Sequence, residues 1–298
     1  MHATLIEVTS REQLLRIQHL TSKYVDTIYF PFSLRTRLDG SFPESPVRVF
    51  AYPTVNSPKY LFMYKENVYI KPTICIAQIP GTTIDRWEVI ECLREFRART
   101  SSGAKSQPHL VIGKEYLVKM YSVLMRIDSC NWESKELNLS LFYMTEQQQK
   151  QALRTPLPKL VKGYYFDELD ATEEGELVNG TWKHAGPGDL EQTIAKISRL
   201  PSSCIRFEGS PVAFEMTDPC GFFNNQFVFP DHRRKGLGNG LEIDLIQKSI
   251  RNGHAPFKTV TKDNVIVLTA SSNSPLWTQW TTEDGVAETV VFQEWKLT

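Results

Sequence analysis

The residues of this chain best suited to chemistry are glycines and cations in the segment 228–241. An apolar strand pattern ends at Pro230, a basic turn follows at 233–235, and Gly236 and Gly238 open an amphipathic stretch. Because glycine has no Cβ, the backbone there can approach a ligand closely, and a helix N-terminus adds partial positive charge. The segment therefore predicts a strand–loop–helix whose backbone N–H groups hold a pyrophosphate.

Two other interpretations of this segment compete with a phosphate cradle. Glycines after a strand can serve turn geometry alone. The basic run could instead contact nucleic acid, but the following helix carries Glu242 and Asp244, and Lys plus Arg equals Asp plus Glu at 34 each. A chain with no net basic field is a poor nucleic-acid binder. The spacing Gly236-x-Gly238-x-Gly240 is not a dinucleotide fingerprint, and no P-loop pattern occurs.

The elements around the loop predict an α/β (α+β) protein with two domains, 1–155 and 156–298, joined by an extended linker near 147–162. In the first domain we expect a helix from Ser10, strands at 47–53, 60–64 and 68–77, a helix at 87–97, a loop at 101–107, a strand at 110–112, a helix at 115–126 and a strand at 137–144. In the second we expect strand 164–168, helices 171–183 and 190–200, strands 203–207, 211–217 and 222–229, helix 236–251, strand 257–261, a helix from Asp263, and a hairpin of 277–282 with 286–295. Both halves share a coarse order of elements, but the equivalent loop of the first, 79–85, has one glycine. This favours a degenerate duplicate.

Composition narrows the class of protein further. The 298 residues contain no apolar run near the roughly 20 needed to span a membrane. The N-terminal residues lack a secretory pattern, and Glu7 and Glu12 disfavour a mitochondrial presequence. Five widely spaced cysteines without a CxxC pair indicate neither a disulfide framework nor a metal site. We therefore expect reduced thiols, no metal, no membrane or nucleic-acid partner, and a cytoplasmic location.

A series of short motifs runs in order through the C-terminal half: Leu177-Val178-Asn179 with Trp182, Leu200-Pro201-Ser-Ser-Cys204, Gly209-Ser-Pro211-Val212, Phe229-Pro230-Asp-His-Arg233-x-x-Gly236-Leu237, Gly253-His-Ala-Pro256, Asn264, and Gln293-Glu-Trp295. In this order and spacing, 164–295 resembles the GNAT superfamily of acyltransferases. Within it, the segment is similar to the glycine N-acyltransferase-like (acyl-CoA:amino-acid N-acyltransferase) family. That family carries an extra N-terminal domain and can be mitochondrial.

The resemblance implies a GNAT fold, a mixed sheet flanked by helices, with a second, degenerate GNAT-like domain at the N-terminus. It also implies transfer of an acyl group from acetyl-CoA or another acyl-CoA to a small amine or amino acid such as glycine, by direct attack. The pantetheine arm would bond the backbone near Phe227 and Val228, and Asn264 would contact the pantetheine or the departing sulfur. Ser271 stands where many GNATs have a tyrosine general acid. The implied pyrophosphate loop is Arg233, Arg234, Lys235, Gly236, Leu237 and Gly238.

The chain departs from the family at Phe222, where the glycine acyltransferases place a glutamate general base. Phenylalanine cannot accept a proton, so the alternatives are Glu215, Asp218 and His232, acting directly or through a water held by Asn224 and Gln226 on the same strand face. Two rival functions follow. One is acetylation of a protein or peptide amine, and the other is a non-catalytic acyl-CoA sensor.

Overall fold

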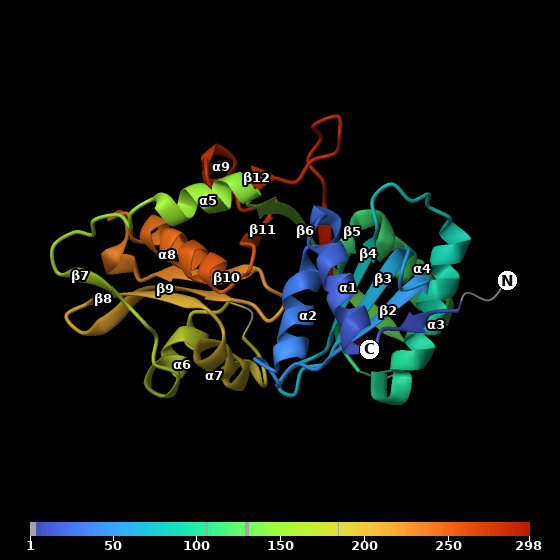
Figure 1. The fold of residues 1–298 in the computed structure, drawn as a ribbon. Coiled ribbons are helices and arrows are strands. Elements are labelled where there is room, and N and C mark those ends of the chain that lie inside the picture. The colour runs from blue at the N-terminus through green and yellow to red at the C-terminus, as the bar shows by residue number, and fades with distance from the viewer. Residues whose placement is uncertain (1–3, 105–106, 129–130, 184) are drawn as a thin grey trace. The chain divides into compact units, whose positions relative to one another are not determined.

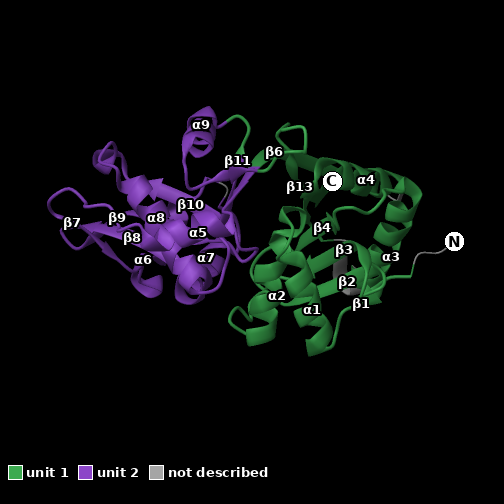
Figure 2. Cartoon of the chain, turned by 45° about the horizontal axis from the view of Figure 1, so that its top comes forward, with its two compact units in different colours: residues 1–140, 261–263, 280–298 green, residues 141–260, 264–279 purple. Residues whose placement is uncertain are grey.

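The computed structural model describes residues 4–104, 107–128, 131–183 and 185–298. The chain forms two compact units (Figure 2). Unit 1 comprises 1–140, 261–263 and 280–298, and unit 2 comprises 141–260 and 264–279. Neither unit is one continuous stretch of sequence, so the units divide the chain differently from the contiguous domains 1–155 and 156–298. The last long strand belongs to unit 1, at the far end of the chain from the other strands of that unit.

Unit 1 is a mixed sheet with helices on it, and its strand order is β1-β2-β3-β4-β5-β13-β6. The strands are β1 (Ile6–Glu7), β2 (Val47–Pro53), β3 (Pro58–Lys65), β4 (Thr73–Gln78), β5 (His109–Lys114), β6 (Trp132–Tyr143, ending in unit 2) and β13 (Val290–Leu297). The helices are α1 (Arg11–Thr21), η1 (Val25–Thr27), α2 (Tyr29–Asp39), α3 (Arg86–Ala104) and α4 (Glu115–Asp128). The core of this unit packs Phe96 of α3 and Leu117 of α4 against Phe50, Phe62 and Ile76 of the sheet.

Unit 2 has the strand order β11-β10-β9-β8-β7. Its strands are β7 (Tyr164–Asp167), β8 (Ser202–Phe207), β9 (Ser210–Thr217), β10 (Phe223–Val228), β11 (Phe257–Thr261) and β12 (Thr278–Gln279), the last pairing with the end of β6. Its helices are α5 (Glu146–Arg154), α6 (Ala171–Gly180), α7 (Asp189–Arg199), η2 (Pro230–His232), α8 (Leu237–Arg251) and α9 (Val265–Asn273).

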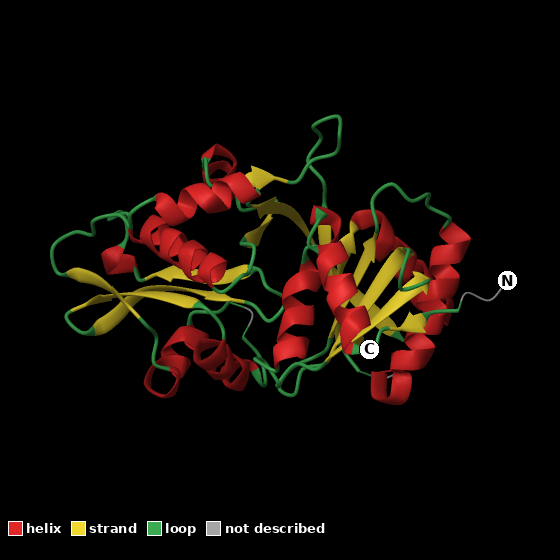
Figure 3. Cartoon of the chain, viewed as in Figure 1, coloured by secondary structure: helices red, strands yellow, loops and turns green. Residues whose placement is uncertain are grey.

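The sheet of unit 2 lies between two helical layers (Figures 1 and 3). On the α7 face, Phe214 and Met216 pack with Val178 of α6 and Ile197 of α7. On the α8 face, Ala213 packs with Leu237 and Leu241 of α8, and Phe223 packs with Leu245 and Ile246. Because neighbouring residues of a strand point to opposite faces, β9 and β10 deliver alternate side chains to two separate environments.

Most elements of the second half are confirmed within a few residues, but the linker prediction is wrong for 147–154, which lies in α5. Thr145 and Gln148 form a capping box at its start. Gln247 of α8 donates to the carbonyls of Ala152 (2.9 Å) and Thr155 (2.6 Å) at its end. Tertiary packing on α8 and a good cap therefore outweigh the loop-like composition.

One helix of the first half was missed, and three predictions, two in the first half and one at the terminal hairpin, are corrected. Helix α2 was not predicted. Residues 68–72 precede the strand, because the side chain of Asn67 accepts from the N–H groups of Tyr69 and Ile70 and makes a turn there. Helix α3 runs to Ala104, into the expected loop. The predicted hairpin is reduced to the bridge Thr281↔Ala287, since β13 pairs with β5 and β6 instead.

None of the helices in the described residues is both long and apolar enough to cross a membrane.

Candidate functional site

The loop before α8 has the backbone geometry of an anion cradle. Arg234 and Gly236 both have left-handed φ angles, 60° and 76°, and Gly236 is the N-cap of α8 with no side-chain cap. The bond from Gly240 N to Gly236 O (3.1 Å) begins the helical ladder. The N–H groups just before Gly240 have no acceptor within the helix, so they are available to an anion at its positive end. The predicted strand–loop–helix is confirmed.

Two of the three cationic side chains of the loop donate hydrogen bonds to backbone carbonyls. Arg233 Nε donates to Val228 O at 2.9 Å, and Lys235 Nζ donates to Asp231 O at 2.7 Å. All three cations of the loop are exposed. A Cβ on Gly238 would lie 3.4 Å from the Oε1 atom of Gln226, so this position has little spare room on the strand side. The geometry fits a pyrophosphate bound mainly by backbone and supplemented by cations.

Strands β10 and β11 separate immediately beyond their first contact. They run parallel and pair at one position, Phe223↔Lys258. In the same region β10 bulges from β9 between Asn224 and Phe227, with Asn225 at a φ of 50°. A bulge leaves backbone groups outside the ladder. We call the unpaired stretch between β10 and β11 the notch: its closed end is at Phe223, and it runs past Phe227 and Val228 toward the loop.

Glu215 is buried on the α8 face at the closed end of this notch, beside the exposed side chain of Gln226. Its carboxylate accepts from Gln226 Nε2 at 3.1 Å, and Gln226 Nε2 also donates to Gly238 O at 3.2 Å. Lys258 of β11 forms an ion pair with Glu242 of α8 beside it. Burial first, and the charge of Glu242 second, raise the pKa of Glu215 to about 8. Glu215 therefore holds a proton at neutral pH and is a poor resting base.

The other predicted catalytic residues, His232 and Ser271, and the predicted cofactor-binding Asn264 make no hydrogen bond with Glu215 in the described residues. The His232 ring nitrogen Nδ1 lies 2.9 Å from the Tyr164 hydroxyl, and its ring packs against Phe207 at the β7–β8 side of the sheet. Asn264 caps α9, accepting from Val267 N at 3.4 Å. Ser271, in α9, is 2% exposed and its hydroxyl has no hydrogen-bond partner among the described residues. Their functional roles stay predictions.

The α7 face at the closed end of the notch carries a different group of residues. Asn224 Nδ2 donates to Asp218 Oδ2 at 3.2 Å, and Asp218 Oδ1 accepts from Cys220 N at 2.8 Å. The Asn224 Oδ1 atom is buried without a partner. The expectation that Gln226 shares this face is wrong, because the bulge at Asn225 reverses the alternation and turns Gln226 toward α8.

Sequence analysis missed Lys196, which reaches into the α7 face. It is 7% exposed, and no hydrogen bond or ion pair reaches it in the described part of the chain. The signal was its place in α7, three residues after buried Thr193 and four after buried Gln192. Helical neighbours at these spacings share a face, so Lys196 points inward with them.

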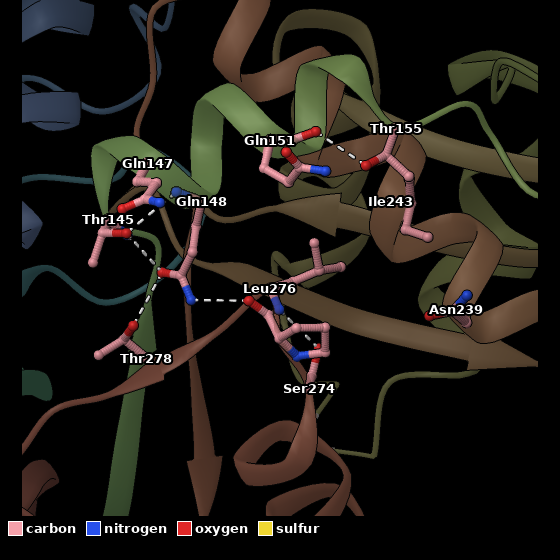
Figure 4. Close-up of a pocket in the computed structure, with 11 residues that line it drawn as sticks. Thr145, Gln147, Gln148, Gln151, Thr155, Asn239, Ile243, Ser274, Leu276 and Thr278 are labelled. Atoms are coloured by element: carbon pink, nitrogen blue, oxygen red, sulfur yellow. Dashed lines mark hydrogen bonds between the residues drawn. The ribbon is translucent and has the colours of Figure 1, made fainter.

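A cleft of about 790 Å³ lies beside the first turns of α8 (Figure 4). Its walls come from α5, α8 and the segment after α9, and the lining residues that Figure 4 draws are Thr145, Gln147, Gln148, Gln151, Thr155, Asn239, Ile243, Ser274, Pro275, Leu276 and Thr278. These side chains are uncharged amides, hydroxyls and apolar groups. The cleft suits a neutral ligand group with hydrogen-bonding atoms, whereas the loop next to Asn239 suits an anion. Across the described residues, no cluster of three His, Cys, Asp or Glu side chains could hold a metal ion.

No family model matches the chain. Among solved structures it is similar to a protein from Drosophila (TM-score 0.74, 15% identity, covering 99% of this chain and 98% of that one). It is also similar to the tandem GNAT protein from the clavulanic acid biosynthesis pathway (TM-score 0.52, 12% identity, 97% and 98%) and to a GCN5-related N-acetyltransferase from Kribbella flavida (TM-score 0.51, 15% identity, 91% and 96%). Over nearly its whole length, the chain has the GNAT fold in a tandem arrangement.

Proposed function

We propose that this protein is an acyl-CoA-dependent N-acyltransferase whose donor site is in unit 2. The observation that carries the proposal is the continuity of one ligand path. An opened parallel strand pair, β10 and β11, leads directly into an uncapped helix N-terminus with two left-handed residues. An extended arm ending in a pyrophosphate matches that path, and the exposed cations of the loop match its charge.

The bulge in β10 supplies a means to polarise the thioester. Asn225 and Gln226 have no register partner on β9, so their N–H groups lie outside that ladder, beside the closed end of the notch. An N–H group aimed at the thioester oxygen stabilises the negative charge that develops as an amine attacks. Donor phosphates at the loop would place the reacting carbon at this end, since the arm extends along β10.

The acceptor we propose is a small amine or amino acid, as the motifs of the C-terminal half indicate. The neutral cleft beside Asn239 would take an uncharged part of the donor. No metal enters the proposed reaction, in which attack by the amine expels the CoA thiol.

Two measurements test the proposal. Addition of CoA at 100 times its dissociation constant should stabilise the chain by about 2.7 kcal/mol, which is seen as a raised Tm. A thiol-release screen should then find transfer from acetyl-, octanoyl- or benzoyl-CoA to glycine, glutamine or spermidine. No thermal shift with CoA or any of these donors contradicts the donor site. Binding without thiol release for every pair supports the sensor instead, and acetylation of peptides alone supports the protein acetyltransferase.

A further inference from the structure

We propose that Lys196, as a neutral amine, is the general base of the acyl transfer, accepting a proton from the attacking nitrogen on the α7 face of the sheet. This inference rests on the proposed acyltransferase function and adds a residue that the sequence motifs do not contain.

The acceptor must approach the notch from the α7 face. The loop directs the donor phosphates to the N-terminus of α8, and on the α8 face the buried side chains of Glu215 and Lys258 lie at the closed end of the notch. Gln226 bonds both Glu215 and the carbonyl of Gly238 there, so the near part of this face is already engaged by side chains and donor loop. We therefore place the acceptor on the opposite face. That face carries Asn224, which is hydrogen-bonded to Asp218, and the buried Lys196, which lies within reach of the charge of Asp218.

The surroundings of Lys196 favour its neutral form. A lysine residue that is 7% exposed, and that has neither an ion pair nor a hydrogen bond in the described chain, loses most of its hydration without an anionic partner in contact. The charged groups whose fields reach it are Asp218 at the end of β9 and Asp189 in the first turn of α7. The buried acid of α6, Glu174, is committed to Arg206. Burial dominates over both aspartates and lowers the pKa of Lys196.

The same surroundings can stabilise the ammonium form of Lys196 that exists after it has accepted the proton. Asp218 lies close enough to stabilise a cation without pairing to it, because its oxygens are occupied by Cys220 N and Asn224 Nδ2. The unpartnered Asn224 Oδ1 can accept from the N–H of the attacking amine and orient it. A desolvated lysine of this kind is a recognised general base.

In the proposed step, one proton moves from the acceptor nitrogen to Lys196 and the acyl group moves from sulfur to nitrogen. The lone pair of the acceptor nitrogen forms the new N–C bond at the thioester carbonyl, and the C–S bond breaks with its electron pair on sulfur. The proton lost by the nitrogen passes to Lys196 Nζ, which becomes an ammonium. That proton then leaves to the CoA thiolate or to solvent, and the amine is restored.

The first test measures the charge state of Lys196 without using activity. Where the native amine is neutral and the unfolded one is protonated, the free energy of unfolding rises with pH toward the unfolded pKa of 10.5. Glu215 contributes a slope of opposite sign in both proteins, so the test is the difference between them: in urea unfolding between pH 6 and 9, the slope of the free energy of unfolding against pH should be more positive in the wild type than in Lys196→Met. Equal slopes in the two proteins would mean a charged lysine and would overturn the proposal.

The second test separates a base from a cation. With the fastest donor and acceptor pair from the thiol-release screen, kcat should fall about a hundredfold or more in both Lys196→Met and Lys196→Arg, while CoA still raises Tm. A base that acts as the neutral amine makes the wild-type kcat rise with pH as the amine loses its proton. This rise should disappear in both variants. The exposed Lys183→Met is the matched control and should keep wild-type kcat. Retained kcat in Lys196→Arg, or in Lys196→Met, overturns the base while leaving the acyltransferase intact. A wild type that binds CoA and transfers to no acceptor overturns both.

Discussion

Each unit has a strand–loop–helix, β4 to α3 in unit 1 and β10 to α8 in unit 2. The two differ in how far the strand pairs with its parallel neighbour. In unit 1, β4 pairs with β5 in parallel at four consecutive positions, from Thr73↔Leu110 to Ile76↔Gly113. In unit 2, β10 and β11 pair once. A Cβ on Gly113 would lie 2.8 Å from Ile76 O, so the first pair is closed tightly where the second is open.

The helix N-termini also differ: that of α3 is capped by a side chain, and that of α8 is not. Asp85 Oδ1 accepts from Trp87 N (2.9 Å) and Glu88 N (3.2 Å), so a carboxylate already satisfies the first turn of α3. At α8 the corresponding place is Gly236, which has no side chain. A carboxylate at a helix N-terminus both competes with a phosphate for the N–H groups and repels it. Of the two strand–loop–helix segments, that of unit 2 has the unpaired strands and the uncapped helix N-terminus that the proposed donor site requires, and that of unit 1 has neither.

The largest expected effect comes from placing a charge in one loop or the other. Gly238→Glu adds a carboxylate where the pyrophosphate would bind and where a Cβ already has little room, so CoA affinity should fall about a hundredfold or more. Thr83→Glu puts the same charge in the loop of unit 1 and should leave affinity unchanged. Calorimetric titration of CoA measures both. Equal losses in the two variants would break the comparison.

Two buried groups, Glu215 in unit 2 and His109 in unit 1, should contribute to the pH dependence of stability with opposite signs. In unit 2, native Glu215 keeps its proton to about pH 8, while the unfolded chain releases it near 4.5. The native state binds more protons in that window, so this residue lowers stability as pH rises. Glu215→Gln should therefore gain more than about 1 kcal/mol relative to wild type between pH 5 and pH 8. Urea unfolding at the two pH values measures the gain.

In unit 1, burial lowers the pKa of His109 to about 4, from 6.5. Its ring stays neutral in the native state while the unfolded chain takes up a proton, so stability falls as pH drops from 6.5 toward 4. His109→Gln should reduce that fall. A steeper fall in the variant than in the wild type would contradict the assignment.

A smaller effect is expected from removing the carboxylate that closes unit 1. Asp85→Ala loses the cap of α3 and should lower the free energy of unfolding by about 1 kcal/mol. Because β4 and β5 stay paired, CoA affinity and stoichiometry should not change. A new CoA site in this variant would show that the cap alone, and not the strand pairing, separates the two units.

The sequence predicted the loop before α8 better than it predicted the residues at the closed end of the notch. The Arg233–Gly238 loop is a local feature, since left-handed positions and a helix start are encoded within a few residues. The reversal of Gln226 depends on a bulge at Asn225, a non-glycine residue with positive φ that no turn signal marks. Lys196 acquires its character from burial under other elements, and α5 exists through its packing on α8. Such properties arise from tertiary contacts that periodicity does not encode.

The most direct test of the account is the number and place of CoA sites on the full chain. Titration should give one CoA per chain, and hydrogen exchange with CoA bound should protect backbone amides in 223–240 without protecting 79–89. Two equivalents of CoA, or protection at the β4–α3 loop, would contradict the claim that only unit 2 retains the donor path.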